Sequence, residues 1–265
     1  MNKLIAFGDS FTWGTDLKDT MNASLSDPCS LDVYKKFHNN RNKMEDFAEV
    51  DHEHKVTTWF AGYSRNTWPA LLADAHNLKY VCYARAGSSN QSIVRQFFQY
   101  LPYISVDDKV VVNWTWIDRW DFFIEKIEVR EQWLTIRASD RGNDEHSKIY
   151  HKYIHHELWC KLETLKAIML IASTLKNKKI PFIMTSIDTL AFDTTYHIPS
   201  YIVNLQNEIA DDINWFDGVG FYDWAKNNNY EISKVGNHPL EEAHIEAFKY
   251  VKENYDFFQY TKSNS

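Results

Sequence analysis

The chain has 265 residues, a length that suits one large domain or two small ones, with 44% hydrophobic and 25% charged residues, as in ordinary globular proteins. Its formal charge of -7 argues against a partner bound through a phosphate backbone, which excludes nucleic acid as a ligand. The aromatic content of 15%, including 10 Trp, is high; such side chains either fill cores or line sugar and acyl sites.

The N-terminus, the cysteines and the apolar segments indicate the cellular compartment that we expect for the protein. Cys29, Cys82 and Cys160 lie far apart and form no Cys-x-x-Cys motif, so free thiols in a reducing compartment are expected. The chain reaches Asp9 before an apolar region of signal-peptide length develops, which predicts no secretory signal. The longest apolar candidate for a membrane span, residues 167–175, is far short of the roughly 20 residues that a bilayer requires.

The first motif follows an apolar run over residues 2–7, which ends at Gly8-Asp9-Ser10. The run predicts a short buried strand, and open α/β folds bind their ligands at the carboxyl ends of such strands. Ser10 is therefore a candidate nucleophile. Taken alone, the tripeptide is equally well interpreted as a strand-ending turn, because Gly, Asp and Ser are common turn residues.

Residues 15–65 are polar, mixed in charge and without a sustained period, which predicts an insertion packed over the end of the sheet where Ser10 lies. No His-Glu-x-x-His pair occurs in it, although histidines and carboxylates lie close together, at His38, His52, His54, Glu49, Asp51 and Glu53. His151, His155 and His156 have helical spacing but no further ligand, and are interpreted as a solvated helix surface. We predict no metal site and no cofactor.

Helix and strand patterns alternate from about residue 66. Helices are expected over 66–75, 90–101, 158–175, 199–213 and 239–251, and β elements over 2–7, 79–84, 109–115, 180–187 and 215–224, the last a short strand or turn. These five β elements predict a three-layer α/β/α sandwich with a mostly parallel five-stranded sheet, flavodoxin-like. We expect a single domain over 1–265, with insertions at about 15–65 and 118–156, the second containing a β-ribbon at 127–139.

Three more segments place chemically useful residues at strand or helix ends. Gly87 follows the second β element in a strand–turn–helix arrangement whose free N–H groups suit an anion, although it also fits a plain turn. Asn113 and Thr115 stand where the third β element ends. His238-Pro239 opens the last helix, where a histidine without chemistry would serve as a cap.

Together these segments resemble the SGNH, or GDSL-type, serine hydrolase superfamily. Gly8-Asp9-Ser10 matches its first block, with Phe11 where many members have Leu; Gly87 fits the second block and His238-Pro239 the last. The resemblance implies that Ser10 attacks an ester carbonyl and that His238 takes its proton and passes it to the leaving alcohol. The N–H groups of Ser10 and Gly87 would hold the oxyanion.

Two departures from the pattern affect the expected site. The third block is usually Gly-x-Asn-Asp, and here Thr115 falls on the position of the Asn, so the third oxyanion donor is Thr115, Asn113 or Asn90. The last block usually has Asp three residues before the His, but positions 235 and 236 are Val and Gly. A Ser-His dyad is expected, with the imidazole oriented by a backbone carbonyl or by a carboxylate from elsewhere in the chain, such as Glu231.

These departures resemble the divergent, phage-encoded members of the superfamily, which implies a cytoplasmic or virion-associated protein. The function expected is a serine esterase that removes an acyl group from a carbohydrate or similar polar ester. The alternative is a weak or inactive binding protein that kept the fold. An α/β-hydrolase is disfavoured because no Gly-x-Ser-x-Gly occurs. Trp59, Trp68, Trp114, Trp116 and Trp120 are either core residues or a sugar platform.

Overall fold

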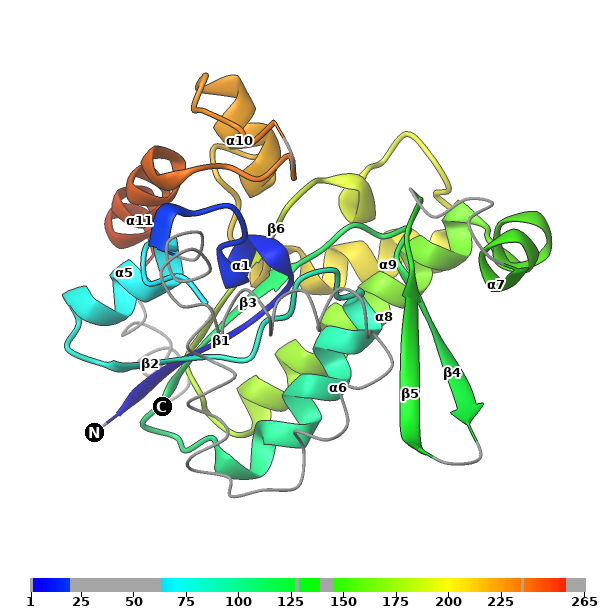
Figure 1. Ribbon diagram of the computed structural model, residues 1–265, viewed down its shortest axis with the longest axis horizontal. Coiled ribbons are helices and arrows are strands. Elements are labelled where there is room, and N and C mark those ends of the chain that lie inside the picture. The colour runs from blue at the N-terminus through cyan, green and yellow to red at the C-terminus, as the bar shows by residue number, and fades with distance from the viewer. Residues whose placement is uncertain (1, 20–62, 127–128, 139–144, 235, 256–265) are drawn as a thin grey trace, which may run out of the picture.

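A parallel sheet forms the centre of the computed structural model, which describes residues 2–19, 63–126, 129–138, 145–234 and 236–255 (Figure 1). Its strands are β1 (Lys3–Phe7), β2 (Lys79–Cys82), β3 (Lys109–Trp114) and β6 (Phe182–Ser186), in the order β2-β1-β3-β6. All three pairings are parallel, which confirms the predicted α/β class. In the described part of the chain this sheet has four strands rather than five, because the expected fifth element is a turn closed by one Phe216–Val219 bridge.

Helices cover both faces of the sheet. One face carries α5 (Trp68–Ala75), α10 (Phe221–Asn227) and α11 (Glu241–Asn254); the other carries α6 (Asn90–Tyr100), α8 (Glu157–Asn177) and α9 (Ser200–Ile209). Because strand side chains alternate, each face has its own core. Leu4, Ala6 and Val111 pack toward α5 and α11, while Ile5 and Phe7 pack toward α6 and α8. The carboxyl edge of the sheet lies between these layers.

The helix ends follow local signals in the sequence. Thr67 precedes α5 and Pro69 lies in its first turn, while Ser89 caps α6 by accepting a hydrogen bond from the N–H of Ser92 at 3.0 Å. The last helix begins at Glu241, later than expected, because Pro239 instead forms a β-bridge with Ile232. Short 3-10 helices follow at Leu101–Tyr103, Leu190–Phe192 and Ala210–Asp212.

The second predicted insertion, 118–156, lies outside the main sheet. It contains an antiparallel hairpin of β4 (Trp120–Lys126) and β5 (Val129–Ile136), then α7 (Glu145–Ile149) and a π-helix (Tyr150–Ile154). The ribbon expected at 127–139 thus begins earlier, since residues 120–126 supply its first strand. Of the first insertion, residues 20–62 are outside the described part of the chain, and Cys29 and the His38–His54 group are among them.

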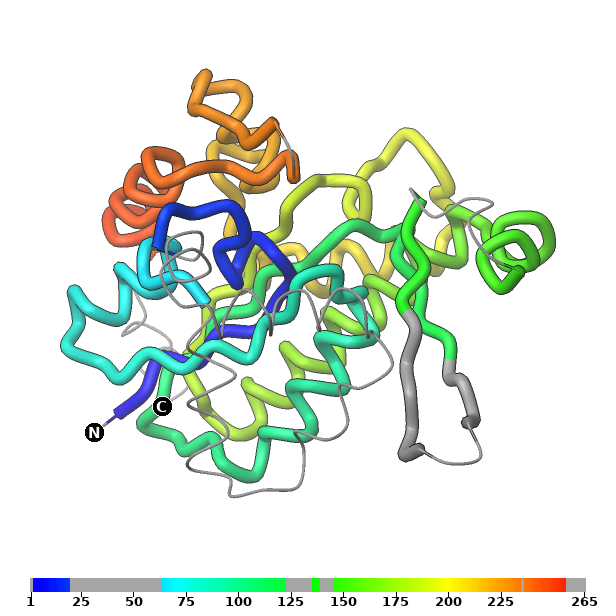
Figure 2. Tube along the Cα trace, in the orientation of Figure 1, coloured from blue at the N-terminus to red at the C-terminus, as the bar shows by residue number. Residues whose placement is uncertain are grey.

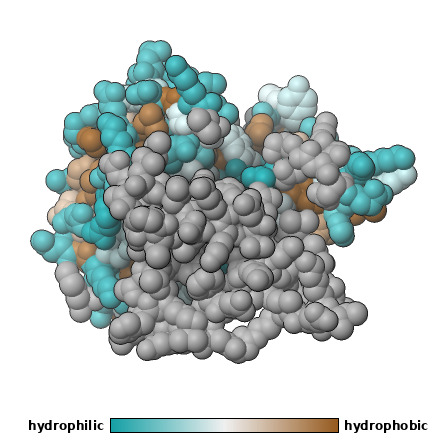
Figure 3. Space-filling view, viewed as in Figure 1, coloured by the Kyte–Doolittle hydropathy of each residue, from teal (hydrophilic) through white to brown (hydrophobic). Residues whose placement is uncertain are grey.

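Hydrophilic side chains predominate among the coloured residues on the face seen in Figure 3. None of the described helices is long and apolar enough to cross a membrane. Cys82 and Cys160 are buried free thiols, as expected.

Candidate active site

Ser10 opens α1 (Ser10–Trp13), a single turn at the carboxyl end of β1. Asp9 caps this turn, since its Oδ1 accepts a hydrogen bond from the N–H of Phe11 at 3.0 Å, and Gly14 ends it with φ 82°. A Cβ on Gly8 would lie 2.2 Å from Oγ1 of Thr12, so the strand-to-helix junction requires glycine there. The backbone thereby holds the Ser10 hydroxyl at the sheet edge.

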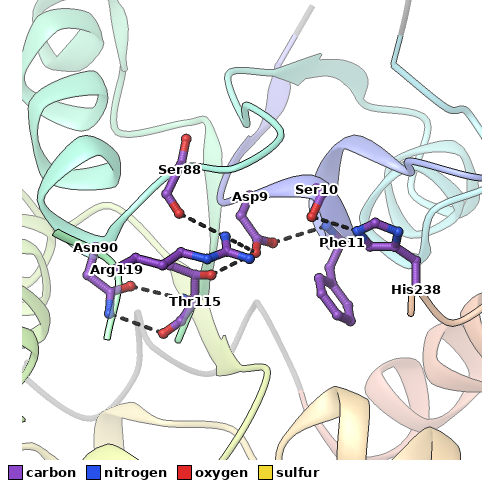
Figure 4. A network of polar contacts seen from close by, with 8 residues as sticks. All are labelled: Asp9, Ser10, Phe11, Ser88, Asn90, Thr115, Arg119 and His238. Carbon is purple, nitrogen blue, oxygen red and sulfur yellow. Dashed lines mark hydrogen bonds and ion pairs between the residues drawn. The ribbon is translucent and has the colours of Figure 1, made fainter. Parts of the chain in front are cut away.

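Ser10 and His238 are in hydrogen-bond contact although they are far apart in sequence. His238 Nε2 lies 2.8 Å from Oγ of Ser10 (Figure 4). The chain before α11, drawn in orange, passes beside the blue segment that follows β1 (Figure 2). This is the arrangement that a nucleophile and its general base require.

Asp16 completes the arrangement, and the sequence analysis missed it. Its Oδ2 lies 2.9 Å from Nδ1 of His238, so the expected dyad is corrected to a Ser-His-Asp arrangement. Asp16 has φ 72°, in the left-handed region that Asp tolerates better than most residues. Glu231 does not fill this role, because the Nδ1 atom that it was expected to orient is bonded to Asp16.

Gly236 makes room for the Asp16 carboxylate. A Cβ at this position would stand 2.3 Å from Oδ2 of Asp16 and 2.3 Å from Nδ1 of His238. The segment before His238 therefore has a glycine beside the imidazole, and the carboxylate comes from the segment that follows α1.

The charge of Asp16 decides which ring nitrogen of His238 carries the proton. Burial raises the pKa of the Asp16 carboxyl, but hydrogen bonds to His238 and Ser233 outweigh it and lower the pKa below the ordinary value. An ionised carboxylate only accepts hydrogen bonds, so Nδ1 of His238 must donate. The Nε2 lone pair then faces the Ser10 hydroxyl.

The two backbone N–H groups expected to form the oxyanion hole are those of Ser10 and Gly87. Gly87 has φ 80° in the turn after β2, which favours glycine. In the described residues we find no hydrogen-bond partner for the N–H of Ser10 or of Gly87. That these two groups hold an oxyanion stays a prediction.

Of the three residues expected to supply the third oxyanion donor, Thr115 and Asn90 use their donor groups on other protein atoms. Thr115 donates its hydroxyl to Oδ2 of Asp9 at 2.7 Å. Asn90 uses its Nδ2 on the carbonyl of Thr115 at 3.1 Å and on Oγ1 of Thr164 at 3.0 Å. Asn113 is buried in β3, where its Oδ1 accepts the Thr185 hydroxyl and its Nδ2 has no hydrogen-bond partner among the described residues, so its role as third donor stays a prediction. These residues join strand ends within the core.

Arg119 is a second residue that the sequence analysis missed. Its Nη1 lies 2.8 Å from Oδ2 of Asp9 and 2.9 Å from the carbonyl oxygen of Ser88 (Figure 4). The Asp9 side chain is fully buried and that of Arg119 is 10% exposed. This ion pair joins the residue before Ser10 to the residue after Gly87.

One aromatic ring, that of Phe11, packs against the imidazole and contacts further aromatic rings in turn. The ring centroid of Phe11 lies 5.1 Å from that of His238 and 6.3 Å from that of Trp116, and Trp116 in turn lies 5.6 Å from Tyr222. Of the other tryptophans proposed as a sugar platform, Trp68 and Trp114 are buried core residues. Trp59 lies outside the described residues.

A cleft of about 280 Å³ adjoins this aromatic group, and we call it the Trp116 cleft. It is lined by Trp116, Asp118, Arg119, Arg137, Ala138 and Leu190. The position that a Cβ would take on Gly87 is 3.9 Å from Nη1 of Arg137, so the cleft also borders the Gly87 turn.

Two further titratable groups are buried near the sheet. Asp188, which follows β6, is 5% exposed; burial first, then the nearby Asp223 and Asp118, raise its pKa to about 7. His244 in α11 is 1% exposed, and burial lowers its pKa to about 3. Nδ1 of this neutral imidazole accepts the N–H of Trp68 at 3.3 Å, which makes His244 a structural histidine.

The described residues contain no group of three or more His, Cys, Asp or Glu side chains that could hold a metal ion. His151 and His155 lie in and after the π-helix, and His156 caps α8 by accepting the N–H of Leu158 at 3.2 Å. These histidines therefore lie at element ends rather than along one regular helix.

Neither a family model nor a curated protein matches this sequence. Similar solved structures include a protein described as a G-D-S-L family lipolytic protein from Desulfitobacterium hafniense, 14% identical, with TM-score 0.46, covering 96% of this chain and 99% of that chain. Esterase EstA from Pseudoalteromonas sp. is 9% identical, with TM-score 0.45 and 96% coverage of both chains. A carbohydrate esterase family 2 enzyme from Corynascus thermopiles is 13% identical, with TM-score 0.44, covering 95% of this chain and 64% of that chain. Similarities this weak carry no argument about activity, which must rest on the site itself.

Proposed function

We propose that this protein is a serine ester hydrolase in which Ser10 is the nucleophile, His238 the general base and Asp16 the orienting carboxylate. The observation that carries the proposal is the pair of hydrogen bonds at one imidazole, 2.8 Å from Nε2 to Ser10 and 2.9 Å from Nδ1 to Asp16. A capping histidine would need neither a hydroxyl nor a carboxylate at these distances.

The chemistry follows from this geometry. His238 Nε2 accepts the Ser10 proton as Oγ bonds to the ester carbonyl carbon, and the imidazolium is stabilised by Asp16. The N–H groups of Ser10 and Gly87 bind the oxyanion, and one such donor is worth roughly 3–4 kcal/mol of barrier. The imidazolium protonates the leaving alcohol, and water then releases the acyl group from Ser10 by the same steps.

The substrate proposed is a carbohydrate or similar polar ester. The phage-like character and a cytoplasmic or virion-associated location stay predictions. The inactive binding protein remains the alternative. Asp16 lies where the usual acid was thought to be absent, which weakens one of the two departures that favoured this alternative, and the identity of the third oxyanion donor is the other.

The test is hydrolysis of p-nitrophenyl acetate together with covalent labelling by a fluorophosphonate. We expect labelling of wild type at Ser10, and loss of labelling and of turnover in Ser10→Ala. Ser173→Ala, an exposed serine change on α8, serves as the matched control and should leave both unchanged. Well-folded wild type that neither labels nor turns over would reject the hydrolase and support the binding protein.

A further inference from the structure

The backbone alone does not fix the two expected oxyanion donors relative to each other. The N–H of Arg85 donates to the carbonyl of Gly8 at 3.2 Å, and in the described part of the chain this is the last backbone hydrogen bond between the segments that follow β1 and β2. Beyond it the turn at Gly87 is closed on itself, because the N–H of Ser88 donates to the carbonyl of Arg85 at 3.1 Å. The distance between the Gly87 and Ser10 N–H groups therefore depends on side chains.

Arg119 bridges the two segments beyond that point. Both of its contacts come from one atom, since Nη1 donates to Oδ2 of Asp9 at 2.8 Å and to the carbonyl of Ser88 at 2.9 Å (Figure 4). Asp9 directly precedes Ser10, and Ser88 directly follows Gly87. One guanidinium nitrogen thus joins the two residues that flank the expected donors.

The bridge is shielded from water, and its carboxylate is fixed by other groups. Asp9 also accepts the N–H of Phe11 at 3.0 Å and the hydroxyl of Thr115 at 2.7 Å. Thr115 is held in turn by Asn90, whose Oδ1 accepts its N–H at 2.9 Å. The side chain of Arg119 is 10% exposed and that of Asp9 is fully buried, so water competes little for these hydrogen bonds. Arg119 therefore pulls the Ser88 carbonyl toward a fixed anchor.

An oxyanion hole works only when its donors already point to the place where charge develops. A donor must lie about 2.7–3.1 Å from the oxyanion, so a displaced turn loses much of its effect on the barrier. Thr115 falls on the position of the superfamily's Asn, and its hydroxyl is engaged by Asp9. With this side-chain donor in use elsewhere, the site depends more on the correct spacing of the two backbone N–H groups.

We infer that Arg119 is the positioning residue of the oxyanion hole and holds the Gly87 turn at the distance from Ser10 at which both N–H groups reach one oxyanion. The inference rests on the proposed esterase activity and adds to it a residue that acts through the backbone. Loss of the guanidinium should therefore slow the chemical step and leave the pairing of Ser10 with His238 unchanged.

Arg119→Met removes both hydrogen bonds and keeps most of the side-chain bulk. We expect kcat for p-nitrophenyl acetate to fall roughly 10- to 100-fold, because a displaced donor keeps part of the roughly 100- to 1,000-fold effect of a whole one. KM and the pH midpoint of kcat/KM should stay as in wild type, because His238 keeps its partners. Arg119→Lys, whose ammonium can donate to both oxygens, should recover about threefold or more of the lost kcat.

Arg95→Met is the matched control. Nη2 of Arg95 lies 2.5 Å from Oδ2 of Asp121, whose side chain is 1% exposed, so this change also takes a guanidinium from a buried carboxylate. It should lower the midpoint of thermal unfolding, as Arg119→Met does, and leave kcat within about threefold of wild type. Equal loss of kcat in the two variants, or a shifted pH midpoint in Arg119→Met, would overturn the inference and leave the hydrolase intact.

Hydrogen exchange tests the position of the turn apart from catalysis. The N–H of Ser88 is protected by its bond to the Arg85 carbonyl. Its exchange should be about tenfold or more faster in Arg119→Met than in wild type, and unchanged in Arg95→Met. Unchanged exchange in Arg119→Met would contradict the inference even where ester hydrolysis by wild type is established. Wild type without labelling or turnover would instead reject the hydrolase, and the inference with it.

Discussion

At the scale of single residues, Asp16 has the most specific role in the proposed site. It holds Nδ1 of His238 at 2.9 Å, its pKa is lowered, and Gly236 leaves the space that its carboxylate fills. A carboxylate in this place fixes the tautomer of the imidazole and stabilises its charged form.

Asp16→Asn tests this role. We expect kcat for p-nitrophenyl acetate to fall by roughly three to four orders of magnitude with little change in KM, because an amide permits the wrong tautomer. The backbone should persist, since Asn also tolerates the left-handed region. Asp211→Asn, at an exposed carboxylate, is the control. A change in kcat of less than about tenfold would refute the role of Asp16.

At the scale of elements, Arg119 joins the ends of three strands. It follows β3, pairs with Asp9 at the end of β1 and bonds the Ser88 carbonyl in the turn after β2. Because the Asp9 side chain is fully buried, the charge of Arg119 also offsets a negative charge beside the proposed oxyanion.

A double-mutant cycle on Asp9→Asn and Arg119→Gln measures this pair. We expect a coupling of about 2–3 kcal/mol in the free energy of unfolding, because either single change leaves a buried group without its partner. Arg65 and Asp74 form the matched exposed pair, also in direct contact at 2.6 Å, and should couple by less than about 1 kcal/mol. Equal coupling in the two pairs would contradict a specific role for Arg119.

The same elements show what the sequence could predict. Strand patterns placed Ser10, Gly87 and Thr115 at one edge, because parallel strands present their carboxyl ends together. Asp16 gave no comparable signal: it lies in a polar stretch without a period, and its partner His238 is 222 positions away. Arg119 and the first strand of the hairpin fell in a segment interpreted as an insertion. Contacts between distant loops depend on tertiary packing, which local periodicity does not encode.

At the scale of the whole molecule, two buried groups titrate with opposite effects on stability. The pKa of His244 is lowered from 6.5 in the unfolded chain to about 3 in the folded protein. The stability that the neutral imidazole contributes is therefore complete above pH 6.5 and is lost as pH falls from 6.5 towards 3. The pKa of Asp188 is raised from 3.8 in the unfolded chain to about 7 in the folded protein. The stability that the protonated carboxyl contributes is therefore complete below pH 3.8 and is lost as pH rises through about 7. Between pH 4 and 6.5, a rise in pH increases the stability contributed by His244 and decreases the stability contributed by Asp188.

Asp188→Asn should separate these contributions. Oδ1 of Asp188 accepts the N–H of Leu190 at 3.0 Å, while Oδ2 is buried with no hydrogen-bond partner among the described residues, so an amide fits without losing a bond. Relative to wild type, the free energy of unfolding of the variant should be little changed near pH 4 and should gain up to about 4 kcal/mol by pH 8. Denaturant unfolding at pH 5 and pH 8 measures the difference, with Asp211→Asn as the exposed control. A difference that does not grow with pH would show that Asp188 is ionised throughout, and its carboxylate would then need a cationic partner in the folded protein.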